Sequence, residues 1–252
     1  SPENDVPTGN WRSVGVSGSF HLDSIAFAAG AHGVWQSSDS GVTWENVSGT
    51  LETPLSNCGG DSCAEFISTI EVSPNFSSDK TVLVGTQEGS IFFRPSTESP
   101  FWVKHCPGNS KSFVDCGDTG LSISDLALSP NFVGRFKDPI DGNTIGPKGE
   151  LFAATSDGLL RTGDSLTSWL QCGASPLNSN VLSVELAADF GNFGQNNKNI
   201  FWKNMLLVGV SGGPGVFRLI GDPGEPICDA EWQNGHGLPP NSEVISLAVS
   251  PN

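Results

Sequence analysis

The stretch ISTIEVSPNF at 67–76 returns as ISDLALSPNF at 123–132, and this repetition decides the fold. The segments WRSVGVSGSF at 11–20 and VLSVELAADF at 181–190 carry apolar residues at the same alternate positions and end on the same phenylalanine. A fifth copy, VISLAVSPN at 244–252, stops one residue before the expected phenylalanine. Apolar residues at every second position predict β-strands, and a unit that recurs about every 56 residues predicts an array of similar sheets.

Each repeat continues with three further strand-like segments in the same order. The second segments are SIAFAAG (24–30), TVLVGT (81–86), ELFAAT (150–155) and NMLLVGV (204–210). The third segments are GVWQS (33–37), SIFFR (90–94), GLLRT (158–162) and GVFRL (215–219). The fourth segments carry Trp44, Trp102, Trp169 and Trp232. Four short strands per unit make one propeller blade, and the stacking of blades buries both faces of each sheet.

The sequence therefore predicts an all-β fold, a β-propeller of four-stranded antiparallel blades. The predicted blades span approximately 11–66, 67–122, 123–180 and 181–243, and 244–252 is the start of a further repeat. Because this last repeat is cut short, we expect 1–252 to be a single β-propeller or, more in keeping with the broken repeat, part of a larger one.

The charge of the chain limits its partners. It carries 27 Asp and Glu against 12 Lys and Arg, a net charge of -15. Phosphate groups are bound by clustered Lys and Arg, so this balance argues against a nucleic-acid partner and against docking on an anionic membrane. No apolar run approaches the roughly 18 residues that a bilayer span requires, and we predict no membrane span.

The cysteines point to an oxidising compartment. We predict the disulfides Cys58–Cys63 and Cys106–Cys116 from their short, loop-borne spacings, and Cys172–Cys228 by elimination. Zinc is the alternative, but the chain has no C-x-x-C pair and only 4 His. Two N-x-S sequons, at Asn46 and Asn75, modestly favour a secretory route with N-glycosylation. We therefore expect a secreted protein or one in an organelle lumen.

A hairpin signature appears in the first repeat. The residues Ser37, Asp39, Gly41, Thr43 and Trp44 match the pattern S/T-x-D-x-G-x-T/S-W. The chain in this respect resembles the Asp-box, or BNR-repeat, propellers of sialidases, xyloglucan-active glycosidases, the sortilin ectodomain and the photosystem II assembly propeller. The third repeat keeps Thr162, Asp164 and Trp169 of this pattern. The resemblance implies a propeller in which the box aspartate holds a peripheral hairpin, so that Asp39 and Asp164 are structural. Enzymes and binding proteins both use this box, so it does not assign a function.

An enzymatic role finds little support in the residues. The resemblance implies that a sialidase would need a tyrosine nucleophile and three clamping arginines, and the chain has no Tyr. One repeat position carries Arg94, Arg161 and Arg218, and we expect it to be a surface position that recurs in each repeat. An acid pair of the glycosidase type could come from the acids near strand ends, but nothing singles out one pair, and we assign no catalytic residue. These acids are Asp23, Glu71, Asp125 and Glu185.

Metal and cofactor sites are not predicted either. The loop at 137–150 offers Asp138, Asp141, Asn143 and Glu150, whose oxygens suit calcium, but their spacing matches no known loop and a solvated loop is favoured.

The variable loops favour a binding role. The insertion at 191–203 places Phe193, Phe201 and Trp202 among amides, where they could contact a partner or pack on their own blade. We predict a non-enzymatic extracellular or lumenal propeller that acts as a scaffold or protein-interaction module in a larger assembly. The alternative is a glycan-binding or glycoside-hydrolase-type propeller. A thylakoid-lumen location is a variant that only the resemblance suggests.

Overall fold

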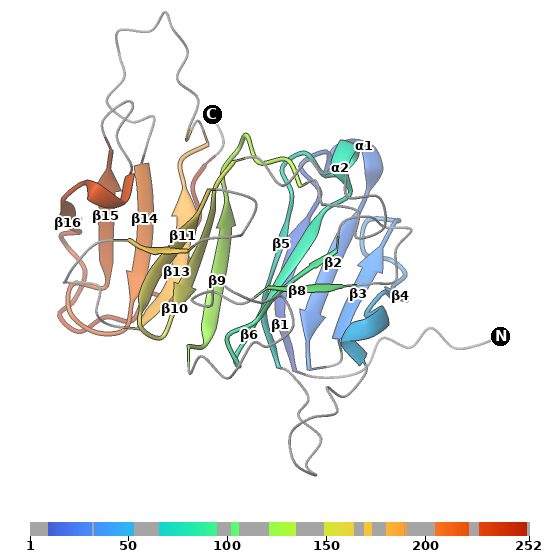
Figure 1. The fold of residues 1–252 in the computed structure, drawn as a ribbon, viewed down its shortest axis with the longest axis horizontal. Coiled ribbons are helices and arrows are strands. Elements are labelled where there is room, and N and C mark those ends of the chain that lie inside the picture. The colour runs from blue at the N-terminus through green and yellow to red at the C-terminus, as the bar shows by residue number, and fades with distance from the viewer. Residues whose placement is uncertain are drawn as a thin grey trace, which may run out of the picture.

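The computed structural model describes most of the sheet-forming residues of the chain. The described residues are 10–31, 33–52, 66–94, 102–105, 121–134, 149–163, 169–172, 180–188, 190, 205–221 and 227–250. Four separate four-stranded antiparallel sheets follow one another along the chain, as predicted. In Figure 1 the first sheet, in blue, lies at one side of the molecule and the fourth, in orange and red, at the opposite side.

The strands have these bounds. The first sheet comprises β1 (Trp11–Val16), β2 (Ala26–Gly30), β3 (Gly33–Ser37) and β4 (Glu45–Asn46). The second comprises β5 (Ile67–Val72), β6 (Val82–Thr86), β7 (Ile91–Arg94) and β8 (Val103–His105). The third comprises β9 (Ile123–Leu128), β10 (Leu151–Thr155), β11 (Gly158–Thr162) and β12 (Leu170–Gln171). The fourth comprises β13 (Val181–Leu186), β14 (Met205–Val210), β15 (Val216–Ile220) and β16 (Trp232–Asn234).

Short helices join some of these strands. The helices α1 (Phe20–Asp23) and α2 (Phe76–Asp79) each begin at the phenylalanine that ends the first-strand motif. Two 3-10 turns, η1 (Gly49–Glu52) and η2 (Ile227–Asp229), complete the described elements. Among the described residues no helix is both long enough and apolar enough to cross a membrane.

Consecutive sheets pack face to face through the same repeat positions. We call the face that carries the positions of Val14 and Val16 the front face, and the face that carries the position of Phe27 the back face. The back face of the first sheet, with Phe27, packs on Ile70 and Val72 of the second. The remaining pairs repeat this arrangement, with Leu83, Ile91 and Phe93 on Leu126, Leu128 and Phe132, and with Phe152 and Leu159 on Val184, Leu186 and Phe190.

Small residues in the second strands allow this close packing. A Cβ added at Gly85 in β6 would collide with the side chain of Ile123, the first residue of the next sheet. The phenylalanines Phe76, Phe132 and Phe190 then fill the space over the back face of the preceding sheet. The rings of Phe27 and Phe76 meet edge to face at 5.5 Å, and those of Phe152 and Phe190 at 5.7 Å.

The row of sheets has two ends. The first strands pack in the order β1, β5, β9 and β13, and the described residues show no comparable contact between β13 and β1. Among the described residues no sheet covers the front face of the first sheet, and Val14 and Val16 are exposed. At the other end, the segment 244–250 lies against the fourth sheet in the place of a further first strand, although it forms no ladder with the described residues.

Candidate functional site

The hairpin at 37–44 is held by the carboxylate that the sequence singled out. Asp39 Oδ1 accepts hydrogen bonds from the Thr43 N–H and the Ser37 hydroxyl, both at 2.8 Å, and Oδ2 accepts one from the Thr43 hydroxyl at 2.6 Å. The Thr43 hydroxyl, then the Thr43 N–H and the Ser37 hydroxyl, lower the pKa of Asp39 to about 2. Gly41 has φ +91°, donates to the Ser37 hydroxyl oxygen, and accepts from the Trp44 indole at 3.1 Å. Asp39 thus has a structural role on an exposed hairpin.

The third repeat carries the partial copy of this hairpin. Thr162 is buried at the end of β11, and Trp169 packs against the core between the second and third sheets. Asp164 lies outside the described residues.

Three of the four candidate acids come together on the first strands. Glu71 in β5 and Glu185 in β13 occupy the same repeat position, and Asp125 in β9 lies two positions earlier in its repeat. All three are half-buried, and they interact electrostatically with one another. Asp23 is separate, because it accepts the hydroxyl of Ser17 at 2.6 Å at the end of α1.

Burial raises the pKa of each carboxyl in this cluster. The pKa of Glu71 is raised well above its usual value, by burial first and then by the charges of Asp125 and Glu185. Burial also raises the pKa values of Asp125 and Glu185. Protonated carboxyls near neutral pH can serve as general acids.

Each of these carboxyls also ties its strand to the next one. Glu71 accepts the backbone N–H of Leu128, and Asp125 Oδ2 accepts that of Val184 at 3.0 Å. Glu185 accepts the N–H of Val249 in the segment 244–250. The cluster therefore has a structural task, because it satisfies backbone donors of the neighbouring first strand.

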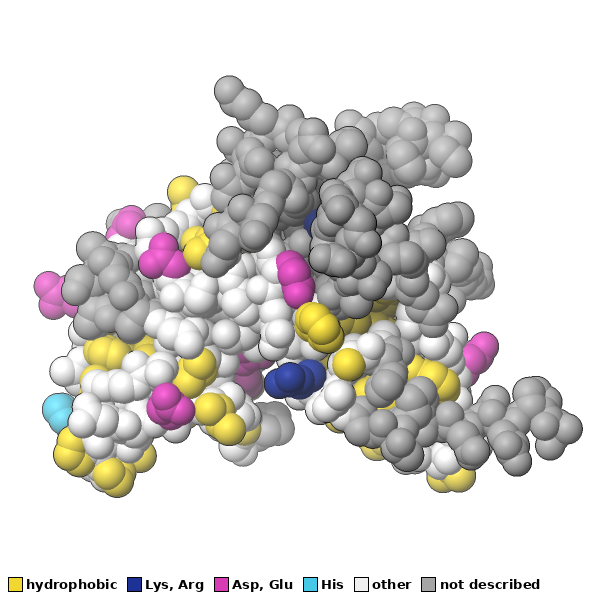
Figure 2. Space-filling model, turned by 90° about the horizontal axis from the view of Figure 1, so that it is seen from below, with side chains coloured by type: hydrophobic (Ala, Val, Ile, Leu, Met, Phe, Trp, Pro, Cys, Tyr) yellow, Lys and Arg dark blue, Asp and Glu magenta, His cyan; other side chains and the backbone are white. Residues whose placement is uncertain are grey.

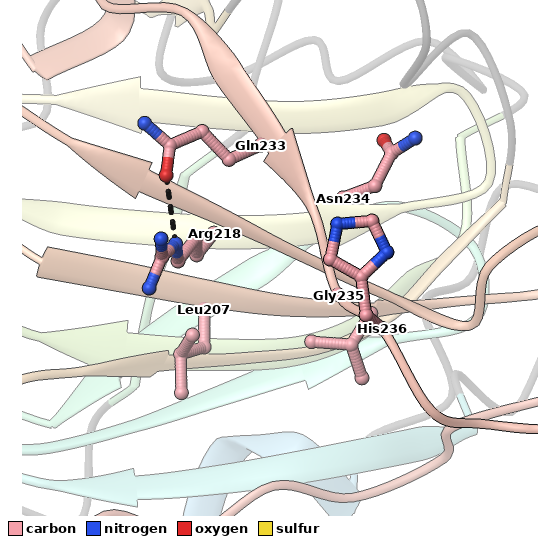
Figure 3. Close-up of a pocket in the computed structure, with 7 residues that line it drawn as sticks. Leu207, Arg218, Gln233, Asn234, Gly235 and His236 are labelled. Carbon is pink, nitrogen blue, oxygen red and sulfur yellow. Dashed lines mark hydrogen bonds between the residues drawn. The ribbon is translucent and has the colours of Figure 1, made fainter.

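A pocket lies on the back face of the fourth sheet. Its cavity of about 500 Å³ is lined by Leu207, Val216, Arg218, Gln233, Asn234, Gly235 and His236. Figure 3 shows the residues that line it and the hydrogen bond from Arg218 Nε to Gln233 Oε1, which is 2.8 Å long. Leu207 has the register position of Phe27, Leu83 and Phe152, which the next sheet covers completely. The pocket thus lies at positions that the next sheet covers in the other repeats, and no further sheet covers them in the part of the chain that the structure describes.

The sequence did not predict this pocket, because its walls are ordinary repeat positions. The register of the repeats could have identified it: Leu207 and Val216 fall where the other repeats have core residues.

The predicted common position of the three arginines needs one correction. Arg161 and Arg218 pair with Phe152 and Leu207 at a common position, but Arg94 pairs with Val82, one residue further along its strand. Two consecutive phenylalanines in β7 shift Arg94 onto the opposite face, where it is buried.

The cysteines and sequons have these positions. Cys172 and Cys228 form a disulfide that joins the ends of the third and fourth sheets, as predicted. The other four predicted disulfide residues lie outside the described residues: Cys58, Cys63, Cys106 and Cys116.

The two predicted N-glycosylation sites differ in their surroundings. Asn46 is exposed in β4, whereas the amide nitrogen of Asn75 donates to the carbonyl of Phe132 at 2.6 Å. A glycan would attach at that nitrogen, so the fold favours Asn46 as the acceptor.

The remaining candidates are placed only in part. Asp138, Asp141, Asn143, Phe193, Phe201 and Trp202 lie outside the described residues. Glu150 is described and pairs with Arg161. In the described ranges, no group of three or more His, Cys, Asp or Glu side chains could hold a metal ion.

Comparison with solved structures establishes the fold class. The β-propeller domain of Cps50 (Swd1) from Myceliophteria thermophila superposes with a TM-score of 0.51 at 11% identity, over 90% of this chain and 58% of that one. The GH74 xyloglucanase from Xanthomonas campestris superposes with a TM-score of 0.52 at 15% identity, over 92% of this chain and 31% of that one. The chain thus spans less than two thirds of either protein. It has a β-propeller fold with four-stranded antiparallel blades, as predicted. No family model and no curated protein matches the sequence.

Proposed function

We propose that this chain is a non-enzymatic scaffold, which binds other proteins through the faces at the ends of its row of sheets. The observation that carries the proposal is the front face of the first sheet. Val14 is 67% exposed and Val16 52%, whereas their counterparts in the other three sheets are all buried. Burying one such side chain is worth about 1.5–3 kcal/mol, so a protein surface laid on this face gains free energy from contacts that the described residues do not make.

Several further features support a scaffold role and the compartment proposed for it. Figure 2 shows apolar side chains in patches towards both ends of one face of the molecule. The Cys172–Cys228 disulfide suits an extracellular or lumenal compartment. The hydrogen bonds of Asp39 to Ser37 and Thr43 are those expected of an Asp-box, and we assign the first sheet to that type of repeat.

The size of the native assembly tests the proposal. We would express the tagged chain in its source and compare it with the double variant Val14→Glu/Val16→Glu. The matched control is Leu22→Glu/Val42→Glu, because these two apolar residues are at least as exposed but lie away from the face. We expect wild type and control to run in a particle larger than 26.4 kDa, and the Val14/Val16 variant to run alone. Equal particle sizes for all three proteins would contradict the proposal.

The second candidate function is glycan binding or glycoside hydrolysis. It is favoured by the cluster of Glu71, Asp125 and Glu185, because a raised pKa suits a general acid and a second carboxylate could act as base or nucleophile. The xyloglucanase neighbour supplies the substrate class to try first. Hydrolysis of xyloglucan that is lost in both Asp125→Asn and Glu185→Gln would favour the enzyme. If the wild type neither hydrolyses nor binds xyloglucan, the scaffold function remains as the proposal.

A further inference from the structure

The sequon at Asn46 is a motif that the scaffold function leaves unexplained. Asn46 lies in β4, the outermost strand of the first sheet (Figure 1), and its side chain is exposed. Its Oδ1 accepts the N–H of Ser48 at 2.8 Å. An N-linked sugar attaches to the amide nitrogen, so this contact of the oxygen can persist in a glycosylated chain.

The pairing of the strands places Asn46 on the front face of the first sheet. Val14 lies opposite Ala28, which lies opposite Trp35. Trp35 in turn lies opposite Asn46. Because directly opposed residues share one face of a sheet, this row runs across the front face from the exposed Val14 to Asn46 at the outer rim.

The corresponding rim position is polar in each of the other three sheets, where it carries Lys104, Gln171 and Asn234. Lys104 is half-buried and the other two are exposed, although a preceding sheet packs on the front face of each of these sheets. The inner ends of the same rows are buried, at Ile70, Leu126 and Val184. A partner that packs on the first sheet in the way that one sheet packs on the next therefore leaves Asn46 uncovered.

The third residue of the sequon indicates when a sugar can be attached. Ser48 is fully buried: its hydroxyl oxygen accepts the N–H of Val34 at 2.9 Å, and its hydroxyl donates to the Val34 carbonyl at 3.3 Å. A Cβ added at Gly33 would collide with this hydroxyl. The sequon requires the serine side chain, so a transfer to Asn46 has to precede the pairing of β4 with β3.

The second sequon lies in different surroundings. Asn75 is half-buried, and its amide nitrogen reaches the third sheet by donating to the carbonyl of Phe132 at 2.6 Å. A sugar on that nitrogen would take the place of this contact between two sheets. The fold therefore favours Asn46 over Asn75.

We propose that Asn46 carries an N-linked glycan, which stands at the rim of the front face and stays accessible when a partner covers Val14 and Val16. The donor is an oligosaccharide on a lipid diphosphate: its anomeric C–O bond to the diphosphate breaks, a C–N bond to Asn46 forms, and the amide nitrogen loses one proton. This inference rests on the proposed function for its compartment and for the partner.

Mass spectrometry of the protein from its source tests the modification and its place. We would treat the native particle and the isolated chain with a peptide-N-glycosidase, which releases the glycan and converts the attached asparagine to aspartate. We expect conversion at Asn46, none at Asn75, equal release from the two samples and an unchanged particle size. An unmodified Asn46 or any modification of Asn75 would overturn the proposal. Release from the isolated chain but not from the particle would overturn the position at the rim.

Two variants expressed in the source assign the added mass. Asn46→Gln removes the acceptor, and Ser77→Ala is the matched control, because it destroys the second sequon at an exposed serine and leaves Asn75 in place. We expect complete loss of the added mass in the first variant and no change in the second. The peptide map of the wild type keeps the test valid even if Asn46→Gln disturbs the fold. An unmodified Asn46 in a particle that still depends on Val14 and Val16 would end this inference and leave the scaffold function intact.

Discussion

Val14 and Val184 are the same residue type at the same position of their repeats, yet Val14 is 67% exposed and Val184 2%. The backbone around the two valines is alike, because each pairs antiparallel with the middle of a second strand, at Ala28 and Val208. The difference arises from the neighbours. Val184 faces the third sheet, whereas Val14 faces none of the sheets that the structure describes.

This difference in exposure predicts that a valine-to-alanine substitution lowers the free energy of unfolding by unequal amounts at the two positions. We expect Val184→Ala to lower the free energy of unfolding by about 2 kcal/mol, because it removes buried methyl groups and leaves a cavity. Val14→Ala should change it by less than about 0.5 kcal/mol, as for other surface positions. Urea unfolding of the isolated chain measures both. Comparable losses for the two variants would mean that the isolated chain covers Val14 in solution.

The Asp39 hairpin predicts a carboxyl that titrates unusually low. Its folded pKa of about 2 lies below the ordinary 3.8, so the stabilisation from this group is complete above pH 3.8 and is lost as the pH falls through about 2. The pH dependence of the Asp39 carboxyl carbon shift in NMR measures this value. Thr43→Val should raise the pKa, because the Thr43 hydroxyl contributes most to the shift. Ser38→Ala is the control, and an unchanged pKa in Thr43→Val would refute the assignment.

The cluster of acids predicts the opposite dependence on pH. The folded pKa of Glu71 is raised, so the folded state holds a proton that the unfolded state releases above about pH 4.5. The free energy of unfolding should therefore fall as the pH rises from 4.5. Glu71→Gln retains an acceptor for the Leu128 N–H without the charge, and it should be more stable than wild type at pH 7, with the gain shrinking towards pH 4. Denaturant unfolding at several pH values checks this. The same substitution at the exposed Glu231 is the control, and a loss of stability at every pH would contradict the account.

The disulfide between the third and fourth sheets predicts a measurable contribution to stability. Cys172 and Cys228 are separated by 56 residues, and a link that closes such a loop is worth about 2–4 kcal/mol. Cys228→Ser should lower the free energy of unfolding by that amount, and the double variant with Cys172→Ser should lose no more. Peptide mapping without reductant identifies the pair directly. The same map tests the predicted pairs Cys58–Cys63 and Cys106–Cys116, and a free thiol at Cys172 would contradict the structure.

The architecture was predictable from the sequence because alternation and repetition are local signals. Ile70 and Val72 in β5 indicate a buried face, and their counterparts in each repeat confirm the register. The position of Arg94 was not predictable in this way, since one shifted residue in a strand reverses the face on which a side chain lies.

The candidate sites were less predictable, because they depend on contacts between repeats. The convergence of Glu71, Asp125 and Glu185 follows from the packing order of the first strands, which one repeat does not contain. The pocket over Leu207 depends on contacts with other parts of the fold: the residue has an ordinary core position, and among the described residues no complete further sheet covers it.

The exposure of Val14 and Val16 in the native particle tests the central claim most directly. Carbene footprinting with mass spectrometry would compare the isolated chain with the particle taken from its source, with Leu22 and Val42 as exposed references. We predict strong labelling of Val14 and Val16 in the isolated chain and their protection in the particle, while the references label equally in both. Equal labelling of Val14 and Val16 in the two samples would show that no protein covers this face, and it would contradict the scaffold function.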